Sequence, residues 1–319
     1  MSERLEDVDS WLSAELARAA DERQAAWADQ RVRELAEGGV DDDGFARTLS
    51  LASRFAPRAP LAPSADAVDA AGALVGGWNP ERWSVLEALR VRLVVARARG
   101  DAETLPAAIE EAFRYADEGE LRALYRSLQF LPGPERFIWR AGEGCRTNMK
   151  SVFEADTCDT GFPVRHLDDV AWRQLCIKAL FVEAPLWRVF GFDERVDSEL
   201  ARMALDLADE RRSAGRSVYP ELWMCLGFEP SDRALESIER ELGGDDELSR
   251  RGAILALGRL GRTDRLEEIE RDGGSLFGPT ARWALLGRHD QAAYRAVSIP
   301  EGAAPTTHAS EAGTPEAAD

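Results

Sequence analysis

Apolar residues recur at three- and four-residue steps along most of the chain, and no long alternation of apolar and polar residues occurs in the sequence. Such spacing places apolar residues on one face of a helix, whereas a strand needs a period of two. The earliest example consists of Leu5, Val8, Leu12 and Leu16. Clusters such as Gly76-Gly77 and Pro132-Gly133-Pro134 interrupt the pattern, because glycine and proline end helices. The sequence therefore predicts an all-α fold of stacked antiparallel helices.

Local signals predict where several helices begin. Ser84 and Glu87 have the spacing of a capping box, in which each side chain binds the other residue's backbone N–H. Asp168 and Ser198 precede apolar runs and are predicted as N-cap residues. Because Pro134 is suited to a helix start, the apolar face that follows it predicts one continuous helix from Glu135 to Ala155.

Shifts in composition divide the chain into four predicted segments. They are an N-terminal helical segment (residues 1–76), a central helical domain (77–228), a short-helix C-terminal part (229–299) and a tail (300–319). The run from Arg251 to Gly261 is typical of HEAT-type repeats, in which each helix pair buries its face against the next pair. The tail is rich in Ala, Pro, Thr, Glu and Gly, and we expect it to be disordered.

The charge balance limits the classes of partner. Lys and Arg number 40 against 58 Asp and Glu, which gives a net charge of −18 and disfavours binding to a nucleic-acid backbone. The N-terminus carries acidic residues and lacks the apolar core of a secretory signal. Charged residues or prolines interrupt every apolar stretch, so we expect a cytoplasmic protein without direct membrane insertion. The 4 cysteines form no C-x-x-C pair and are expected to be buried free thiols.

Motifs of known catalytic mechanisms do not occur in the sequence. The 3 histidines fall in no metal-binding spacing, and no nucleophile elbow, dinucleotide-binding or phosphate-binding loop is present. Asp206, Asp209 and Glu210 have a spacing that suits Mg²⁺, but such clusters in a highly charged chain are usually solvated helix faces. We therefore assign no catalytic residue, metal or cofactor.

A group of polar residues in the central segment is the candidate ligand site. On the predicted helix it includes Arg146, Asn148, Lys150 and Glu154, and on the next helix Trp172, Gln174 and Lys178. Lys150 and Lys178 are the only lysines of the chain, and an aromatic ring, an amide and an ammonium together suit an oxygen-rich or anionic small molecule. The same residues are equally compatible with ion pairs along a helix, which stabilise it by a few tenths of a kcal/mol each.

Several of these runs resemble the EboA family. They are Gly77-Trp78-Asn79-Pro80 with Trp83, Leu131 to Phe137, Ala141 to Met149 with Val152 to Ala155, Leu167 to Trp172 with Gln174, Lys178 to Phe181, Asp197 to Ala201, Glu210-Arg211 and Pro220 to Trp223. The resemblance covers Trp78 to Gly227. The chain departs from the family pattern at Arg173 and in the loop from Cys158 to Arg165, which affects the ligand rather than the fold.

The resemblance implies a cytoplasmic component of a bacterial pathway that makes or moves a small metabolite. Genes of this family lie in a cluster with those of a prenyltransferase-like membrane protein, a sugar-phosphate-cyclase-like protein, a metal-hydrolase-like protein and isomerase-like barrel proteins. These pathway proteins are therefore the implied partners. The family has no established catalytic residues that carry over to this sequence.

Three functions remain open at this point. The first is an accessory helical protein that binds a metabolite or pathway proteins. The second is an all-α enzyme acting on a polar, cyclitol- or prenyl-linked metabolite, with Lys178 or Glu154 as acid or base and Arg146 holding an anion. The third is an adaptor that docks on the membrane protein. Convergence of the candidate side chains on one enclosed pocket favours the enzyme, whereas pairing between them favours the accessory protein.

Overall fold

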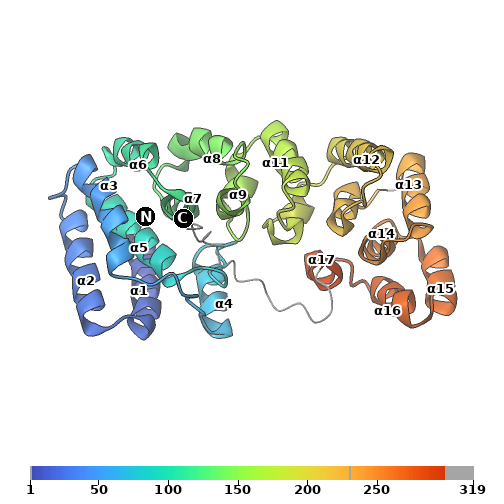
Figure 1. Ribbon diagram of the computed structural model, residues 1–319, viewed down its shortest axis with the longest axis horizontal. Coiled ribbons are helices and arrows are strands. Elements are labelled where there is room, and N and C mark those ends of the chain that lie inside the picture. The colour runs from blue at the N-terminus through green and yellow to red at the C-terminus, as the bar shows by residue number, and fades with distance from the viewer. Residues whose placement is uncertain (1, 230, 299–319) are drawn as a thin grey trace, which may run out of the picture.

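The helices form one curved array that follows the order of the chain, as the computed structural model of residues 2–229 and 231–298 shows (Figure 1). These residues contain helices, loops and a single isolated bridge between Pro60 and Ser84, which confirms the all-α prediction. Among them, no helix combines the length and the apolar character needed to cross a membrane. The predicted tail, residues 300–319, lies outside the described residues.

The N-terminal end of the array is built around a buried helix. Its helices are α1 (Ser2–Ala19), α2 (Glu22–Ala36), α3 (Asp42–Leu51), α4 (Ala65–Leu74) and α5 (Val85–Gly100). Helix α5 packs against α1 and α2, and it is buried from Val85 to Ala98. Because apolar side chains surround it on all sides, the burial of its arginines requires ion pairs, such as the one from Arg92 to Asp9 at 2.9 Å.

The centre of the array continues this packing. Its helices are α6 (Leu105–Arg114), α7 (Glu118–Ser127), α8 (Ile138–Gly144), α9 (Lys150–Thr157), α10 (Phe162–His166) and α11 (Asp169–Phe181). Helix α7 packs against α5 on one side and α9 on the other, so these three helices form a continuous inner layer. The short 3₁₀ helix η4 (Leu186–Arg188) follows α11 and packs against it, and its Arg188 side chain donates to Glu154 of α9.

The prediction of one continuous helix from Glu135 to Ala155 is wrong. The segment forms a 3₁₀ helix η3 (Pro134–Phe137), then α8 and α9, which are separated by a non-α break from Cys145 to Met149. Gly144, a weak helix former, lies at this break, and an added Cβ there would lie 2.5 Å from Asp156. The break lets α9 turn back and bury Val152 and Phe153 against α7.

The capping predictions have mixed outcomes. Ser84 and Glu87 form the capping box of α5, and the Asp168 carboxylate caps α11 by accepting from the backbone N–H of Ala171. Ser198 is not the N-cap of α12 (Ser198–Ser213), because Asp197 takes that position and accepts from the backbone N–H of Leu200 at 2.8 Å. Both residues are good caps, and the carboxylate of Asp197 also pairs with Arg173.

The C-terminal helices complete the array and return toward its centre. They are the 3₁₀ helix η6 (Pro220–Leu226), α13 (Asp232–Leu242), α14 (Glu247–Arg259), α15 (Thr263–Asp272), α16 (Gly274–Leu285) and α17 (Gln291–Ser298). Helix α14 is the most buried of the α-helices in this group, and α17 packs on both α14 and η4. The relationship to HEAT-type repeats stays a prediction. All four cysteines are free, with Cys158, Cys176 and Cys225 buried and Cys145 partly buried.

Candidate ligand-binding cleft

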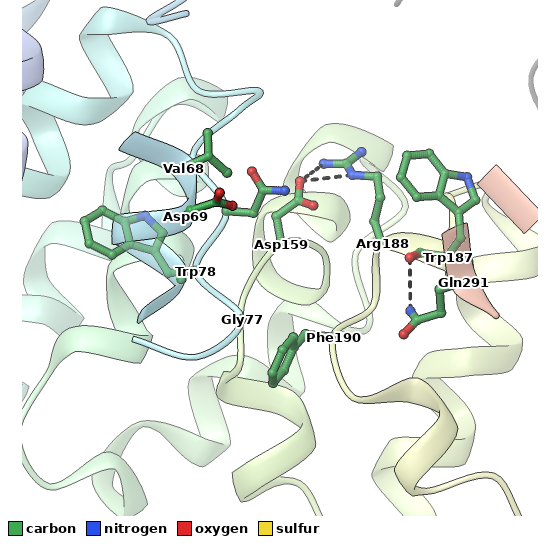
Figure 2. Close-up of a pocket in the computed structure, with 11 residues that line it drawn as sticks. Val68, Asp69, Gly77, Trp78, Asp159, Trp187, Arg188, Phe190 and Gln291 are labelled. Atoms are coloured by element: carbon green, nitrogen blue, oxygen red, sulfur yellow. Dashed lines mark hydrogen bonds and ion pairs between the residues drawn. The ribbon is translucent and has the colours of Figure 1, made fainter. Parts of the chain in front are cut away.

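A cleft of about 400 Å³ opens at the middle of the array, between α4 and the returning α17 (Figure 2). Its lining combines segments that are far apart in the sequence: Val68, Asp69, Gly72, Gly77, Trp78, Asn79, Asp159, Trp187, Arg188, Phe190 and Gln291. Its volume falls within the range that small-molecule sites occupy, roughly 300–1,000 Å³. The cleft is therefore large enough for a metabolite.

Close backbone contacts form the floor of the cleft. Gly77 adopts a φ of +85°, and a Cβ added to it would lie 2.7 Å from the backbone nitrogen of Gly161. The Arg165 guanidinium ties the two loops together, since it donates to the carbonyl oxygen of Gly76 at 2.7 Å and to that of Gly161 at 3.2 Å. Only glycine accommodates both this backbone conformation and this approach of two loops.

A buried guanidinium organises the centre of the cleft. Arg188 donates to Oδ2 of Asp159 through Nε at 3.0 Å and Nη2 at 2.5 Å, and to Oε2 of Glu154 through Nη1 at 2.7 Å. The Arg188 and Asp159 side chains are each only 6 % exposed. Burial alone lowers the pKa of Arg188, but the nearby Asp159 and Glu154 outweigh it and raise the pKa. Arg188 therefore stays charged and fixes both carboxylates.

Trp187 forms the wall opposite Trp78 (Figure 2). The guanidinium carbons of Arg82 and Arg295 lie 5.3 and 5.2 Å from its ring centroid, which is cation–π distance. Both arginines pair with Glu81, at 3.1 and 3.8 Å. The side-chain amide of Gln291 donates to the Trp187 carbonyl at 3.0 Å. Because Gln291 and Arg295 belong to α17, these contacts hold the C-terminal helix against the cleft.

Two polar groups of residues beside the cleft, Asp69 and Trp78, have no hydrogen-bond partner in the part of the chain that the structure describes. The Asp69 carboxylate, on the exposed side of α4, makes no hydrogen bond or ion pair there. Trp78 is only 1 % exposed, and its indole Nε1–H is buried without a hydrogen-bond acceptor in the same set of residues. Unpaired buried donors are rare, because each costs roughly 1–3 kcal/mol. The Trp78 indole packs edge-to-face with the rings of Trp11 and Phe130, and its N–H is closed to solvent, whereas the Asp69 carboxylate is exposed to water.

The structure distributes the sequence-predicted ligand residues over two places, neither of which is the cleft itself. At the surface, Arg146 pairs with Glu143 within its own turn, and Lys178 donates to Oδ1 of Asn148 at 2.6 Å. Gln174 is also exposed. The Asn148–Lys178 contact is the one pairing between the two predicted helices that this group forms in the described residues.

The remaining predicted residues lie deeper. Glu154 accepts from Arg188 and so stands directly behind the cleft, with Lys150 4.0 Å from its other oxygen. Trp172 is a core residue that is 1 % exposed, with the Arg195 guanidinium 5.0 Å from its ring. The seven residues therefore do not converge on one enclosed pocket. Glu154 alone connects the predicted set to the cleft.

The acidic cluster on α12 is explained by ion pairs. Asp206 and Asp209 both accept from Arg233, at 2.7 and 3.0 Å, and Asp206 also accepts from Arg202. In residues 2–229 and 231–298, no group of three or more His, Cys, Asp or Glu is arranged to hold a metal ion.

Sequence reasoning missed the two residues at the centre of the cleft, Asp159 and Arg188. Asp159 has a φ of +58°, a conformation that Asp tolerates better than most residues. The Asp159-Thr160-Gly161 run is thus a turn signal that was available in the sequence. Nothing local marks Arg188 among the many arginines of the chain. Its role depends on the packing of η4 against the 158–161 loop.

Two buried carboxyl groups near this region hold protons more tightly than usual. Burial raises the pKa of Glu221 from 4.5 to about 7, even though its carboxylate accepts from the backbone N–H of Leu186 at the start of η4. Burial also raises the pKa of Asp156 well above 3.8, and the weak hydrogen bond from the Cys145 thiol, at 3.5 Å, opposes this only in part. Both groups favour the protonated form in the folded state.

Replacing Glu221 by glutamine should therefore change how stability depends on pH. Between its unfolded pKa of 4.5 and its folded pKa of about 7, Glu221 is protonated only in the folded state, so wild-type stability falls as pH rises through this interval. From about pH 5 to about pH 8 the free energy of unfolding should fall by about 2 kcal/mol more for the wild type than for Glu221→Gln, as measured by urea unfolding. Asp156 is present in both proteins, so its contribution to the pH dependence cancels when they are compared. Parallel plots of the free energy of unfolding against pH for the two proteins would contradict the prediction.

The fold and the cleft define a helical-array protein with a metabolite-sized opening at its centre. The model of the family described as metabolite traffic protein EboA matches residues 6–227, which is more than half of the chain. The chain belongs to the EboA family. The match extends the resemblance seen from Trp78 onward back through α4, α3 and α2 into α1. No curated protein and no solved structure matches the chain.

Proposed function

We propose that this protein is an accessory binding protein that holds a small metabolite in the cleft between α4 and α17. The observation that carries the proposal is the lining itself, since four segments that are distant in the sequence meet around about 400 Å³. The family's description as a metabolite traffic protein supports a role in handling a metabolite. We further propose that it acts in the cytoplasm.

The alternative, an all-α enzyme that uses Lys178 or Glu154, receives less support from the geometry. Lys178 is engaged by Asn148 at the surface, and Glu154 is engaged by Arg188 behind the cleft. Neither residue lines the cleft, and a general acid or base must lie within hydrogen-bond reach of the proton that it transfers.

Docking to the pathway proteins implied by the family is a second candidate role. Several large apolar side chains are exposed along the array, including Trp139 at 61 % and Phe181 at 67 %. Phe181 lies beside Lys178, whose ammonium is 5.4 Å from its ring centroid. Exposed apolar side chains contribute to protein-binding surfaces where they gather into a patch with a polar rim. The prenyltransferase-like, cyclase-like and isomerase-like proteins are the proposed partners.

Native mass spectrometry of the protein purified from its own host tests the binding role. We expect the wild type to carry a small-molecule adduct, and Val68→Trp to lose it, because the larger side chain fills the cleft from α4. The matched control is the double variant Arg146→Ala, Lys178→Ala, whose residues lie at the surface and should leave the adduct in place. Circular dichroism confirms that each variant is folded.

Three results would contradict or redirect the proposal. Wild-type protein without any adduct would count against a metabolite cleft. An adduct that survives Val68→Trp but disappears from the double variant would move the site to the surface residues predicted from the sequence. A bare protein that co-purifies with the pathway proteins would favour the docking role.

A further inference from the structure

We infer that Glu221 is a positioning residue of the cleft: its carboxyl group holds η4, and with it Trp187 and Arg188, against η6, and its protonation sets how firmly η4 is held. This inference rests on the proposed function, because it describes what controls the same cleft. Glu221 itself does not line the cleft and acts through η4.

The 3₁₀ helix η6 gives Glu221 a firm support. Pro220, which begins η6, packs so closely on α14 that a Cβ added to Gly252 would collide with the Pro220 carbonyl oxygen. Trp223 is fully buried, and its indole N–H donates to the hydroxyl of Ser249 on α14 at 3.4 Å. Because close-packed interiors deform little, the Glu221 side chain extends from a fixed backbone.

Three side chains fix η4 to its surroundings. Glu221 accepts from the backbone N–H of Leu186 at the start of η4. The Gln291 amide of α17 donates to two carbonyl oxygens of this segment, at 3.0 and 2.8 Å (Figure 2). Arg188 makes the buried ion pairs behind the cleft. Of the three, Glu221 alone titrates near neutral pH, since its pKa is about 7, the pKa of Arg188 is raised, and an amide does not titrate.

Docking of η4 is therefore linked to the proton on Glu221. Release of η4 exposes the carboxyl group to water and returns its pKa from about 7 toward 4.5. Between these values the docked form holds a proton that the released form gives up, so docking is strongest at acidic pH and weakens as the pH rises. With full exposure, the equilibrium constant for release increases by roughly 70-fold from pH 5 to pH 8.

The other groups around η6 keep their charge state over this range. They are Arg188 of η4, Lys150 of α9, Arg212 of α12, Arg259 of α14, Tyr294 and Ser298 of α17, and Cys225 of η6 itself. Lysine and arginine side chains stay charged between pH 5 and pH 8. Burial raises the pKa of Cys225 to about 12 and also raises the pKa of Tyr294, so both stay neutral.

Hydrogen–deuterium exchange over residues 186–189 tests the inference without a ligand. After correction for intrinsic exchange, the opening constant of the wild type should rise by several tens of fold from pH 5 to pH 8. Glu221→Gln keeps an oxygen that accepts from Leu186 but cannot ionise, so its opening constant should not change with pH. Glu221→Ala lacks the acceptor and should open more readily than Glu221→Gln at both pH values.

Glu199→Gln is the matched control, because it makes the same chemical change on the exposed first turn of α12 and should behave like the wild type. A wild-type opening constant that does not change with pH would overturn the inference, even if global unfolding keeps its pH dependence. A pH dependence that survives in Glu221→Gln would overturn it as well, because another group would then control η4.

The adduct of host-purified protein extends the test to the cleft. Dialysis should remove more adduct from the wild type at pH 8 than at pH 6, whereas Glu221→Gln should lose equal amounts at both. Equal loss from the wild type at the two pH values would contradict the link between η4 and the ligand. Protein without any adduct would count against the proposed function, and the exchange experiment would still decide the role of Glu221.

Discussion

Replacing Arg188 by methionine is expected to lower the free energy of unfolding by about 3–5 kcal/mol. The variant keeps a long side chain but removes the hydrogen-bonded cation of Asp159 and Glu154, whose side chains are only 6 % and 12 % exposed. The remaining cations, Arg82 at 3.8 Å from Asp159 and Lys150 at 4.0 Å from Glu154, are too distant to replace its hydrogen bonds. A buried carboxylate without a partner is far costlier than one with a hydrogen-bonded guanidinium. Urea unfolding at neutral pH measures the change.

Arg146→Met is the matched control for this substitution. Arg146 pairs with Glu143 within one turn, but its side chain is 72 % exposed, so water already screens the pair. We expect its loss to change stability by no more than about 0.5 kcal/mol. If Arg188→Met behaved like Arg146→Met, the buried network would not be holding the centre of the cleft together. Loss of the native adduct from a still-folded Arg188→Met would add support for the cleft.

Replacing Gly77 by alanine should destabilise the protein by about 3 kcal/mol, from two separate causes. The φ of +85° is strained for any residue with a Cβ, and that Cβ would lie 2.7 Å from both Gly161 N and Phe190 Cγ. One of these neighbours is backbone and the other is the ring carbon nearest the main chain, so neither moves away easily. Thermal and urea unfolding both report the loss.

Gly215→Ala separates the two causes. Gly215 also has a positive φ, of +67°, yet nothing lies within 4 Å of the position that its Cβ would take. This variant should therefore show only the conformational part, about 1 kcal/mol. Equal effects at the two glycines would show that the loops around Gly77 and Gly161 can separate without loss. The backbone at the floor of the cleft would then be less rigid than its packing indicates.

Helix positions could be predicted from the sequence wherever the signal was local. The capping box of Ser84 with Glu87 and the cap at Asp168 are confirmed, because a cap depends on residues within one turn of the helix start. The continuous helix from Glu135 to Ala155 was predicted wrongly. In the sequence, the apolar residues before and after the break keep the spacing of a single helix face, so the break is not visible there. Only the packing of α9 on α7 shows where the chain must turn.

The cleft could not be predicted in the same way. Helical spacing placed Lys150 and Glu154 on one stripe of the predicted helix with Arg146 and Asn148 beside it, but the break from Cys145 to Met149 leaves Arg146 and Asn148 outside both helices. Of the predicted residues, Glu154 is tied to the cleft through Arg188, while Trp172 packs in the core. Whether any of the seven binds a ligand stays a prediction.

By itself, the sequence determined that the chain is helical, where many of its helices begin, and which family its residues resemble. These properties depend on neighbours within a few residues, which the order of amino acids states directly. Only the tertiary structure decided that Asp69, Asp159 and Arg188 share one cleft, and that α17 returns to close it. Pairing one arginine among many with its carboxylates depends on how distant helices pack, because burial determines which charges must be neutralised.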